Sequence, residues 1–231
     1  MTPDLRCYVI TDGTSRRAVD AAVAAASAGA GVVQVRAKDS CTRELVEFAG
    51  TVADAVHQTN PTTRVLVDDR ADVAFALQRA AKHVHGVHLG PDDLSPLDAR
   101  ALLGQEAIIG VTTGTLDLVH RANAMADVAD YAGAGPYRPT PTKDTGRPPL
   151  GVDGYRPLVV ASRLPLVAIG DVTPADVSSL AATGVAGVAL VRAVMQASDP
   201  GGVVRAVLRA MDRANGTGHH GSDPRPEVPR P

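Results

Sequence analysis

Eight short apolar runs rich in β-branched residues recur along the chain, separated by alanine-rich segments with helical spacing. The apolar runs are residues 7–11, 32–36, 64–69, 86–90, 107–111, 129–133, 165–170 and 187–191. The alanine-rich segments include residues 18–30, 43–58, 71–81, 116–126 and 174–184. Because the runs are continuously apolar, they indicate strands covered on both faces, as in a parallel sheet flanked by helices. Repeated strand–helix units of this number favour an α/β fold of the (β/α)8 TIM barrel type.

An open doubly wound sheet is the alternative arrangement of the same elements. It loses its main support because residues 14–20, after the first run, read TSRRAVD and lack the glycine-rich turn of dinucleotide-binding sheets.

A chain of 231 residues with 45% hydrophobic residues can bury one substantial core. We therefore expect a single barrel domain over residues 1–213. Residues 214–231 are rich in Gly, Pro and polar residues, and we expect a disordered tail there.

Charge and aromatic content limit what the chain can bind. A net charge of −2, two Phe, four Tyr and no Trp argue against a nucleic-acid-binding protein, which needs a basic surface and stacking aromatics. No apolar run approaches the ~20 residues of a membrane span, and the N-terminus lacks a signal-peptide pattern. We therefore expect a cytoplasmic protein that binds small molecules, and neither nucleic acid nor membranes.

Basic side chains follow the second apolar run, where a parallel barrel would place its active site. Gln34, Arg36 and Lys38 occupy alternate positions, so the two-residue period of a strand directs them to one side, toward the barrel mouth. The fork of an arginine and the point charge of a lysine suit a multiply charged anion such as pyrophosphate.

Carboxylates follow the next two runs. Asp68 and Asp69 end the third run, and Asp92 and Asp93 follow the fourth. Carboxylates that face each other across one rim repel, whereas Mg²⁺ between them reverses this and binds phosphate oxygens at the same time. The pattern does not decide which of Asp92 and Asp93 faces the metal. We interpret His88, at the end of the fourth run, as a packing residue.

A Gly/Pro-rich loop follows the sixth run within residues 129–151, and it contains Thr140, Thr142 and Lys143. Its backbone N–H groups, hydroxyls and ammonium suit a phosphorylated ligand.

A second anion site is predicted after the last two runs. Barrels of this type commonly bind a monophosphate with the loops after their seventh and eighth strands. In this chain those positions are Gly170 and Asp171, then Val191 and Arg192.

Five segments in this order carry a resemblance to a known family. They read QVRAK at 34–38, DDRADVA at 68–74, GVHLGPDDL at 86–94, DYAGAGPYRPTPTK at 130–143 and VAIG at 167–170. Together they resemble the thiamine phosphate synthase family, and the likeness extends over residues 8–194. Members of this family join hydroxymethylpyrimidine pyrophosphate to thiazole phosphate. The resemblance implies a Mg²⁺-dependent transferase that forms thiamine monophosphate through a carbocation-like species and without a covalent enzyme intermediate.

The resemblance also implies roles at the pyrimidine end. Gln34, Arg36 and Lys38 would bind the pyrimidine pyrophosphate. Thr112 stands where the family has a serine near the pyrophosphate. Asp68 stands where the family usually has an asparagine, and it adds negative charge to the substrate site.

Further implied roles concern the metal and the thiazole end. Asp69 and Asp93 would hold Mg²⁺, and Thr140 and Thr142 would bind the thiazole phosphate. Lys143 would neutralise the departing pyrophosphate, so Arg36, Lys38 and Lys143 form the implied catalytic set.

Two departures from the family pattern fall at the thiazole phosphate site. Asp171 replaces the second glycine of a pair, and Arg192 stands where the family often has a serine. A carboxylate about 4 Å from a phosphate costs on the order of 4 kcal/mol per charge pair at an effective dielectric of 20. We therefore expect either an Asp171–Arg192 ion pair, or Arg192 on the phosphate with Asp171 facing solvent.

Two other functions remain open. A thiazole tautomerase, a related barrel, would use a histidine after the fifth strand, where this chain has residues 112–115 reading TTGT. A degenerate barrel that binds phosphorylated ligands without turnover is the non-enzymatic alternative. The sequence also leaves the oligomeric state open, a homo-oligomer included.

Overall fold

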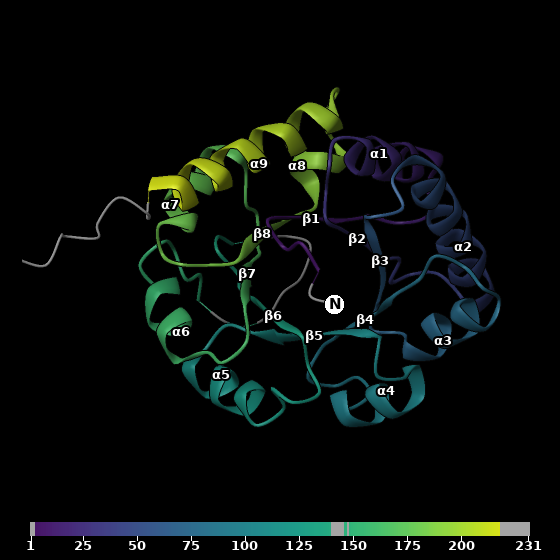
Figure 1. Cartoon of the computed structure of the whole chain (residues 1–231), viewed down its shortest axis with the longest axis horizontal. Coiled ribbons are helices and arrows are strands. Elements are labelled where there is room, and N and C mark those ends of the chain that lie inside the picture. The colour runs from purple at the N-terminus through teal and green to yellow at the C-terminus, as the bar shows by residue number, and fades with distance from the viewer. Residues whose placement is uncertain (1–2, 140–145, 147, 218–231) are drawn as a thin grey trace, which may run out of the picture.

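The computed structural model describes residues 3–139, 146 and 148–217, which form a closed barrel of eight parallel strands surrounded by helices (Figure 1). The strands pair in chain order, and the last pairs with the first. They are β1 (Cys7–Ile10), β2 (Val32–Val35), β3 (Arg64–Asp68), β4 (Gly86–Leu89), β5 (Ile108–Thr113), β6 (Tyr131–Ala134), β7 (Leu166–Ala168) and β8 (Gly187–Leu190). Each predicted apolar run overlaps one of these strands, and β5 and β6 extend one or two residues beyond their runs, so the (β/α)8 prediction is confirmed.

Helices cover the outside of the barrel (Figure 1). They are α1 (Arg16–Ser27), α2 (Thr42–Thr59), α3 (Ala71–Arg79), α4 (Pro96–Leu103), α5 (Leu116–Asn123), α6 (Tyr155–Ala161), the 3₁₀ helix η1 (Pro174–Asp176), α7 (Val177–Ala181), α8 (Arg192–Met195) and α9 (Pro200–Thr217). The segment 174–184, predicted as one helix, is divided between η1 and α7. Asp176 accepts a hydrogen bond from the Thr173 backbone N–H at 2.9 Å, which stabilises the tight 3₁₀ turn at its start.

The C-terminal helix extends past the predicted domain boundary. Residues 214–217, which we assigned to the tail, continue α9, while residues 218–231 lie outside the described residues. Ala210 and Met211 are buried, and a helix stabilised by such contacts can run on for another turn through its own backbone hydrogen bonds. No helix in the described part of the chain is long and apolar enough to span a membrane.

The two faces of each strand contact different apolar layers, which explains the continuous apolar runs. On β2, Val33 and Val35 pack against the helices, whereas Val32 packs inside the barrel. Gln34 has the same parity as Val32 and is 2% exposed. Alternation therefore directs Gln34, and Arg36 beyond the strand end, toward the barrel axis.

Two tyrosines fill the barrel interior beneath the C-terminal ends of the strands. The Tyr8 and Tyr131 hydroxyls are 2.7 Å apart, and both residues are buried. The ring of Tyr131 lies directly over Gly110, where an added Cβ would come 2.2 Å from Cζ of the ring. Glycine at position 110 is therefore required for the tyrosine to enter the barrel.

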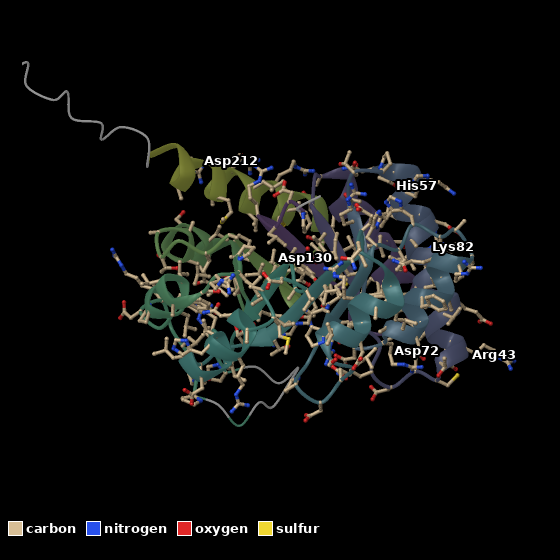
Figure 2. All side chains as sticks on the ribbon, turned by 60° about the horizontal axis from the view of Figure 1, so that its bottom comes forward. Arg43, His57, Asp72, Lys82, Asp130 and Asp212 are labelled. Atoms are coloured by element: carbon tan, nitrogen blue, oxygen red, sulfur yellow. The ribbon has the colours of Figure 1, made fainter. Side chains whose placement is uncertain are left out.

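Three histidines form a cluster at the rim formed by the N-terminal ends of the strands, with their rings in tilted and edge-to-face contact. The ring centroids of His57 and His83 are 4.5 Å apart, and those of His83 and His85 are 4.4 Å apart. Figure 2 shows His57 at this rim, at the opposite end of α2 from Arg43. Burial, followed by the positive charges of His83 and Arg64, lowers the pKa of His85 to about 4.

This depressed pKa predicts that acid destabilises the fold through His85. The unfolded chain binds a proton at His85 near pH 6.5, whereas the folded chain does so only near 4, so the contribution to stability is complete above 6.5 and is lost as the pH falls toward 4. Because the ring is partly exposed, we expect about 1–2 kcal/mol of this loss between pH 7 and 4.5 to disappear in His85→Gln. Urea unfolding at both pH values measures the difference.

His120→Gln, which removes an exposed histidine from α5, is the matched control. If both variants keep the pH dependence of the parent chain, His85 does not cause it.

Candidate active site

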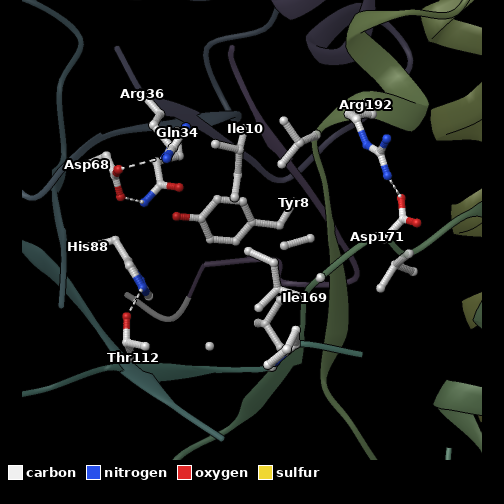
Figure 3. Close-up of a pocket in the computed structure, with 18 of the residues that line it drawn as sticks. Tyr8, Ile10, Gln34, Arg36, Asp68, His88, Thr112, Ile169, Asp171 and Arg192 are labelled. Carbon is white, nitrogen blue, oxygen red and sulfur yellow. Dashed lines mark hydrogen bonds and ion pairs between the residues drawn. The ribbon is translucent and has the colours of Figure 1, made fainter. Parts of the chain in front are cut away.

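A pocket opens at the C-terminal rim of the barrel, and it brings together side chains from strands distant in the sequence (Figure 3). Most of the site residues predicted from the sequence line it. These are Gln34, Arg36, Lys38, Asp68, Asp69, Thr112, Gly170, Asp171, Val191 and Arg192. Asp93, the second predicted metal ligand, is not among the residues that line the pocket. Thr140, Thr142 and Lys143 lie outside the described residues.

Asp68 holds two of the predicted anion-binding residues in place. Its Oδ1 accepts a hydrogen bond from Gln34 Nε2 at 3.1 Å, and its Oδ2 lies 3.3 Å from Arg36 Nε (Figure 3). The Arg36 and Asp68 side chains are only 17% and 12% exposed. An asparagine has one acceptor oxygen and no charge, so it could not present a separate charged oxygen to each neighbour. The aspartate therefore stabilises both neighbours, at the cost of a negative charge in the pocket.

Lys38, Asp69 and Asp93 form a second charged group beside the first. Lys38 forms an ion pair with Asp69, whose φ of 59° turns the chain at the end of β3. The Asp93 carboxylate accepts from the Gly90 backbone N–H at 2.7 Å. Burial raises the pKa of Asp93, and the adjacent Asp69 carboxyl raises it further. Asp92 is exposed, so Asp93 is the acid that faces Asp69.

These two carboxylates are suited to Mg²⁺. The ion favours oxygen ligands and is commonly held by one or two carboxylates together with substrate phosphates and water. Burial is the main cause of the raised pKa of Asp93, and the nearby Asp69 carboxyl adds to it; a cation between the two carboxylates would favour their charged forms. Within residues 3–139, 146 and 148–217, no group of three or more His, Cys, Asp or Glu side chains could hold a metal.

His88 is held by hydrogen bonds at both ring nitrogens. Nδ1 lies 3.0 Å from the Tyr131 hydroxyl, and Nε2 lies 3.1 Å from Thr112 Oγ1 (Figure 3). The Tyr131 hydroxyl is in turn hydrogen-bonded to the Tyr8 hydroxyl, so the hydrogen-bonded row continues into the barrel interior. Both ring nitrogens of His88 thus have hydrogen-bond partners, and His88 itself lines the pocket beside Thr112.

Asp171 and Arg192 form an ion pair where β7 and β8 end. Arg192 Nη2 lies 2.5 Å from Asp171 Oδ1 (Figure 3). Of the two arrangements expected from the sequence, the ion pair is the one that the structure contains.

Sequence reasoning missed Tyr8, which lines the pocket, and Arg138, which supports the loop that carries Asp171. Arg138 Nη1 donates to the Asp171 carbonyl oxygen at 3.2 Å and to Asp176 Oδ2 at 2.8 Å, which links the loops after β6 and β7. Tyr8 lines the pocket from inside the barrel. The two-residue alternation of β1 could have identified Tyr8, but no local signal pairs Arg138 with an acid 38 positions away.

The sequence matches known proteins over nearly its whole described length. A family model described as thiamine monophosphate synthase matches residues 7–194. A thiamine-phosphate synthase of Corynebacterium jeikeium is 58% identical over 212 residues, which are 92% of this chain and 97% of the relative. Another from Corynebacterium efficiens is 58% identical over 208 residues, covering 90% of this chain and 95% of the relative.

A solved structure gives the same result for the fold. The thiamine phosphate pyrophosphorylase from Pyrococcus furiosus superimposes with a TM-score of 0.77 at 30% identity, covering 92% of this chain and 98% of that one. The chain therefore belongs to the thiamine monophosphate synthase family.

Proposed function

We propose that this chain is a transferase that joins 4-amino-2-methyl-5-hydroxymethylpyrimidine pyrophosphate to thiazole phosphate, forming thiamine monophosphate and pyrophosphate. One observation carries the proposal. Gln34, Arg36, Lys38 and Asp69 line one edge of the pocket. Asp93 does not line the pocket but lies against Asp69, so a diphosphate and a cation could be bound together at this edge.

The reaction needs no nucleophilic side chain. The bond between the pyrimidine methylene carbon and the diphosphate oxygen breaks, and its electron pair leaves with the diphosphate. The electron-rich aminopyrimidine ring stabilises the cation that remains, and the thiazole nitrogen then attacks the methylene carbon to form the new C–N bond. Arg36 and Lys38 stabilise the negative charge that grows on the departing oxygens, and we assign Lys143 the same role.

Gln34, Asp68 and Thr112 would position the pyrimidine substrate. Gln34 and Arg36 are already oriented by Asp68, so little side-chain freedom is lost when the diphosphate binds. Thr112 is oriented by His88 and presents its hydroxyl at the pocket edge.

Asp69 and Asp93 would hold Mg²⁺, which when bound supplies positive charge to the diphosphate oxygens. The oxygen ligands and the mutual repulsion of the two carboxylates support this assignment. Lys38 then shares Asp69 with the ion and provides an ammonium donor for the substrate.

The thiazole phosphate would bind at the opposite side of the mouth. We assign it to Thr140 and Thr142, together with the strand ends at Gly170 and Val191. A thiazole phosphate bound there would present its nitrogen to the methylene carbon from across the pocket, so that the two substrates could react in line.

Incubation of the purified chain with both substrates and MgCl₂ tests the proposal, with mass spectrometry of thiamine monophosphate and an assay for pyrophosphate. We expect the two products in equal amounts, and no products in EDTA. Binding of both substrates without turnover would identify a degenerate barrel. Isomerisation of a thiazole precursor in the absence of pyrimidine substrate would identify a tautomerase.

A further inference from the structure

The Asp171–Arg192 ion pair stands at the position where barrels of this type commonly bind a monophosphate, after the seventh and eighth strands. Both residues line the pocket, and their side chains are 31% and 36% exposed. Arg192 Nη2 donates a hydrogen bond to Asp171 Oδ1 at 2.5 Å. Partly exposed pairs of this kind are weak, worth roughly a factor of five or less in an equilibrium constant. A ligand of higher charge could therefore compete for the guanidinium.

The backbone around Asp171 is anchored, so such an exchange would involve side chains only. Arg138 donates to the Asp171 carbonyl oxygen at 3.2 Å, and its own backbone N–H donates to the Gly170 carbonyl oxygen at 3.0 Å. Gly170 packs so closely that an added Cβ would lie 2.6 Å from Pro136 Cα. The carboxylate and the guanidinium are thus the parts of this site that can change partners.

The charges of the two possible partners differ. A phosphate monoester carries a charge of about −1.5 to −2 near pH 7, with three acceptor oxygens, whereas the Asp171 carboxylate carries at most −1. Arginine binds such oxyanions with two or more N–H groups at once. A phosphate beside Arg192 would also lie close to Asp171, so the carboxylate must turn away when the phosphate binds.

We propose that Arg192 binds the phosphate of the thiazole substrate and that Asp171 is an internal counter-ion, which this phosphate displaces. The inference rests on the proposed function and adds a specificity-determining pair to it. Because the phosphate must displace Asp171, the pair weakens phosphate binding overall. It favours dianionic phosphate esters, because a singly charged ligand would only exchange one single negative charge beside Arg192 for another. The uncharged thiazole alcohol gains nothing from Arg192.

Three variants test the exchange: Asp171→Asn, Arg192→Gln and the double variant. Asparagine suits position 171 because it tolerates the φ of 57° found there. Titration calorimetry measures binding of thiazole phosphate, with thiazole alcohol as the probe that lacks the phosphate. Asp54→Asn is the matched control, since it removes an acid from an ion pair with Lys82 and Asp54 is 45% exposed.

We expect Asp171→Asn to bind thiazole phosphate about 3- to 5-fold more tightly, and Arg192→Gln to bind it about 10-fold more weakly. In the Arg192→Gln background, Asp171→Asn should change the affinity by less than about twofold, because no guanidinium remains to be released. The affinity for thiazole alcohol should not change in any variant. Asp54→Asn should bind thiazole phosphate with the same affinity as the parent chain.

Three results would overturn the proposal. Weaker binding in Asp171→Asn means that Asp171 orients Arg192 instead of competing with the phosphate. An equal gain with and without Arg192 means direct repulsion, and unchanged affinity in Arg192→Gln removes Arg192 from the site. Thermal unfolding identifies variants that do not fold, in which case Asp171→Gly and Arg192→Lys replace them. Because the titrations measure binding of one substrate, their failure is separate from a failure to form thiamine monophosphate.

Discussion

Replacing Asp69 by Asn is expected to lower kcat/KM for thiamine monophosphate formation by about 10³-fold, because it removes one of the two carboxylates assigned to the metal. The φ of 59° at this position is one that asparagine tolerates, so the turn at the end of β3 is retained. The variant also loses the carboxylate that pairs with Lys38. The loss should therefore appear in the metal dependence of the reaction and not in the fold.

Steady-state kinetics over a range of MgCl₂ concentrations measure the effect, and electron paramagnetic resonance of Mn²⁺ measures metal binding without substrates. Asp72→Asn is the control, because Asp72 is an acid of the same segment, pairs with Arg70 at 2.6 Å and is 61% exposed. Figure 2 shows Asp72 at the outer edge of the barrel. An Asp69→Asn variant with unchanged activity and Mn²⁺ affinity would remove the metal from this site.

The second large effect is expected from Arg36→Met. We expect kcat/KM for the pyrimidine substrate to fall by about 10²- to 10³-fold, since a largely buried guanidinium that stabilises the leaving diphosphate is lost. Arg36 is 17% exposed and reaches the pocket from the end of β2. The KM for thiazole phosphate should change by less than about twofold, because that substrate is assigned to the other side of the mouth.

A fold effect must be separated from this catalytic effect. Removing Arg36 leaves the Asp68 carboxylate with fewer partners in a buried place, which costs stability. Asp68→Asn in the Arg36→Met background should recover that stability without recovering activity. Arg16→Met is the surface control, since the Arg16 side chain is 86% exposed. Equal losses for both substrates in Arg36→Met would contradict the assignment of separate subsites.

The strands could be predicted because their signal is local. Each barrel strand contacts the helix layer with one face and the barrel interior with the other, so β-branched runs such as residues 64–69 stand out in the sequence. The end of α9 at Thr217 could not be predicted in the same way. Helical hydrogen bonds extend beyond the last buried side chains, and hydrophobic periodicity does not record that extension.

The pocket could be predicted in part for the same reason. Gln34 and Arg36 are polar residues at alternate positions in and beyond an apolar run, and the alternation directed them correctly to the barrel axis. Which of Asp92 and Asp93 faces Asp69 followed only from the turn after β4, where the Gly90 backbone N–H holds the Asp93 carboxylate. Two adjacent aspartates in one loop have the same local sequence surroundings, so the sequence does not indicate which of them points toward Asp69.

The amino-acid sequence alone determined the barrel, the order of its strands and the side of the barrel on which the charged residues gather, because these depend on apolar periodicity within short segments. The tertiary structure decided which charged groups pair: Asp68 with Gln34 and Arg36, and Asp171 with Arg192. Such pairs join strands far apart in the chain, and their geometry depends on strand register and on closure of the barrel. Neither the strand register nor the closure of the barrel can be predicted from a local sequence pattern.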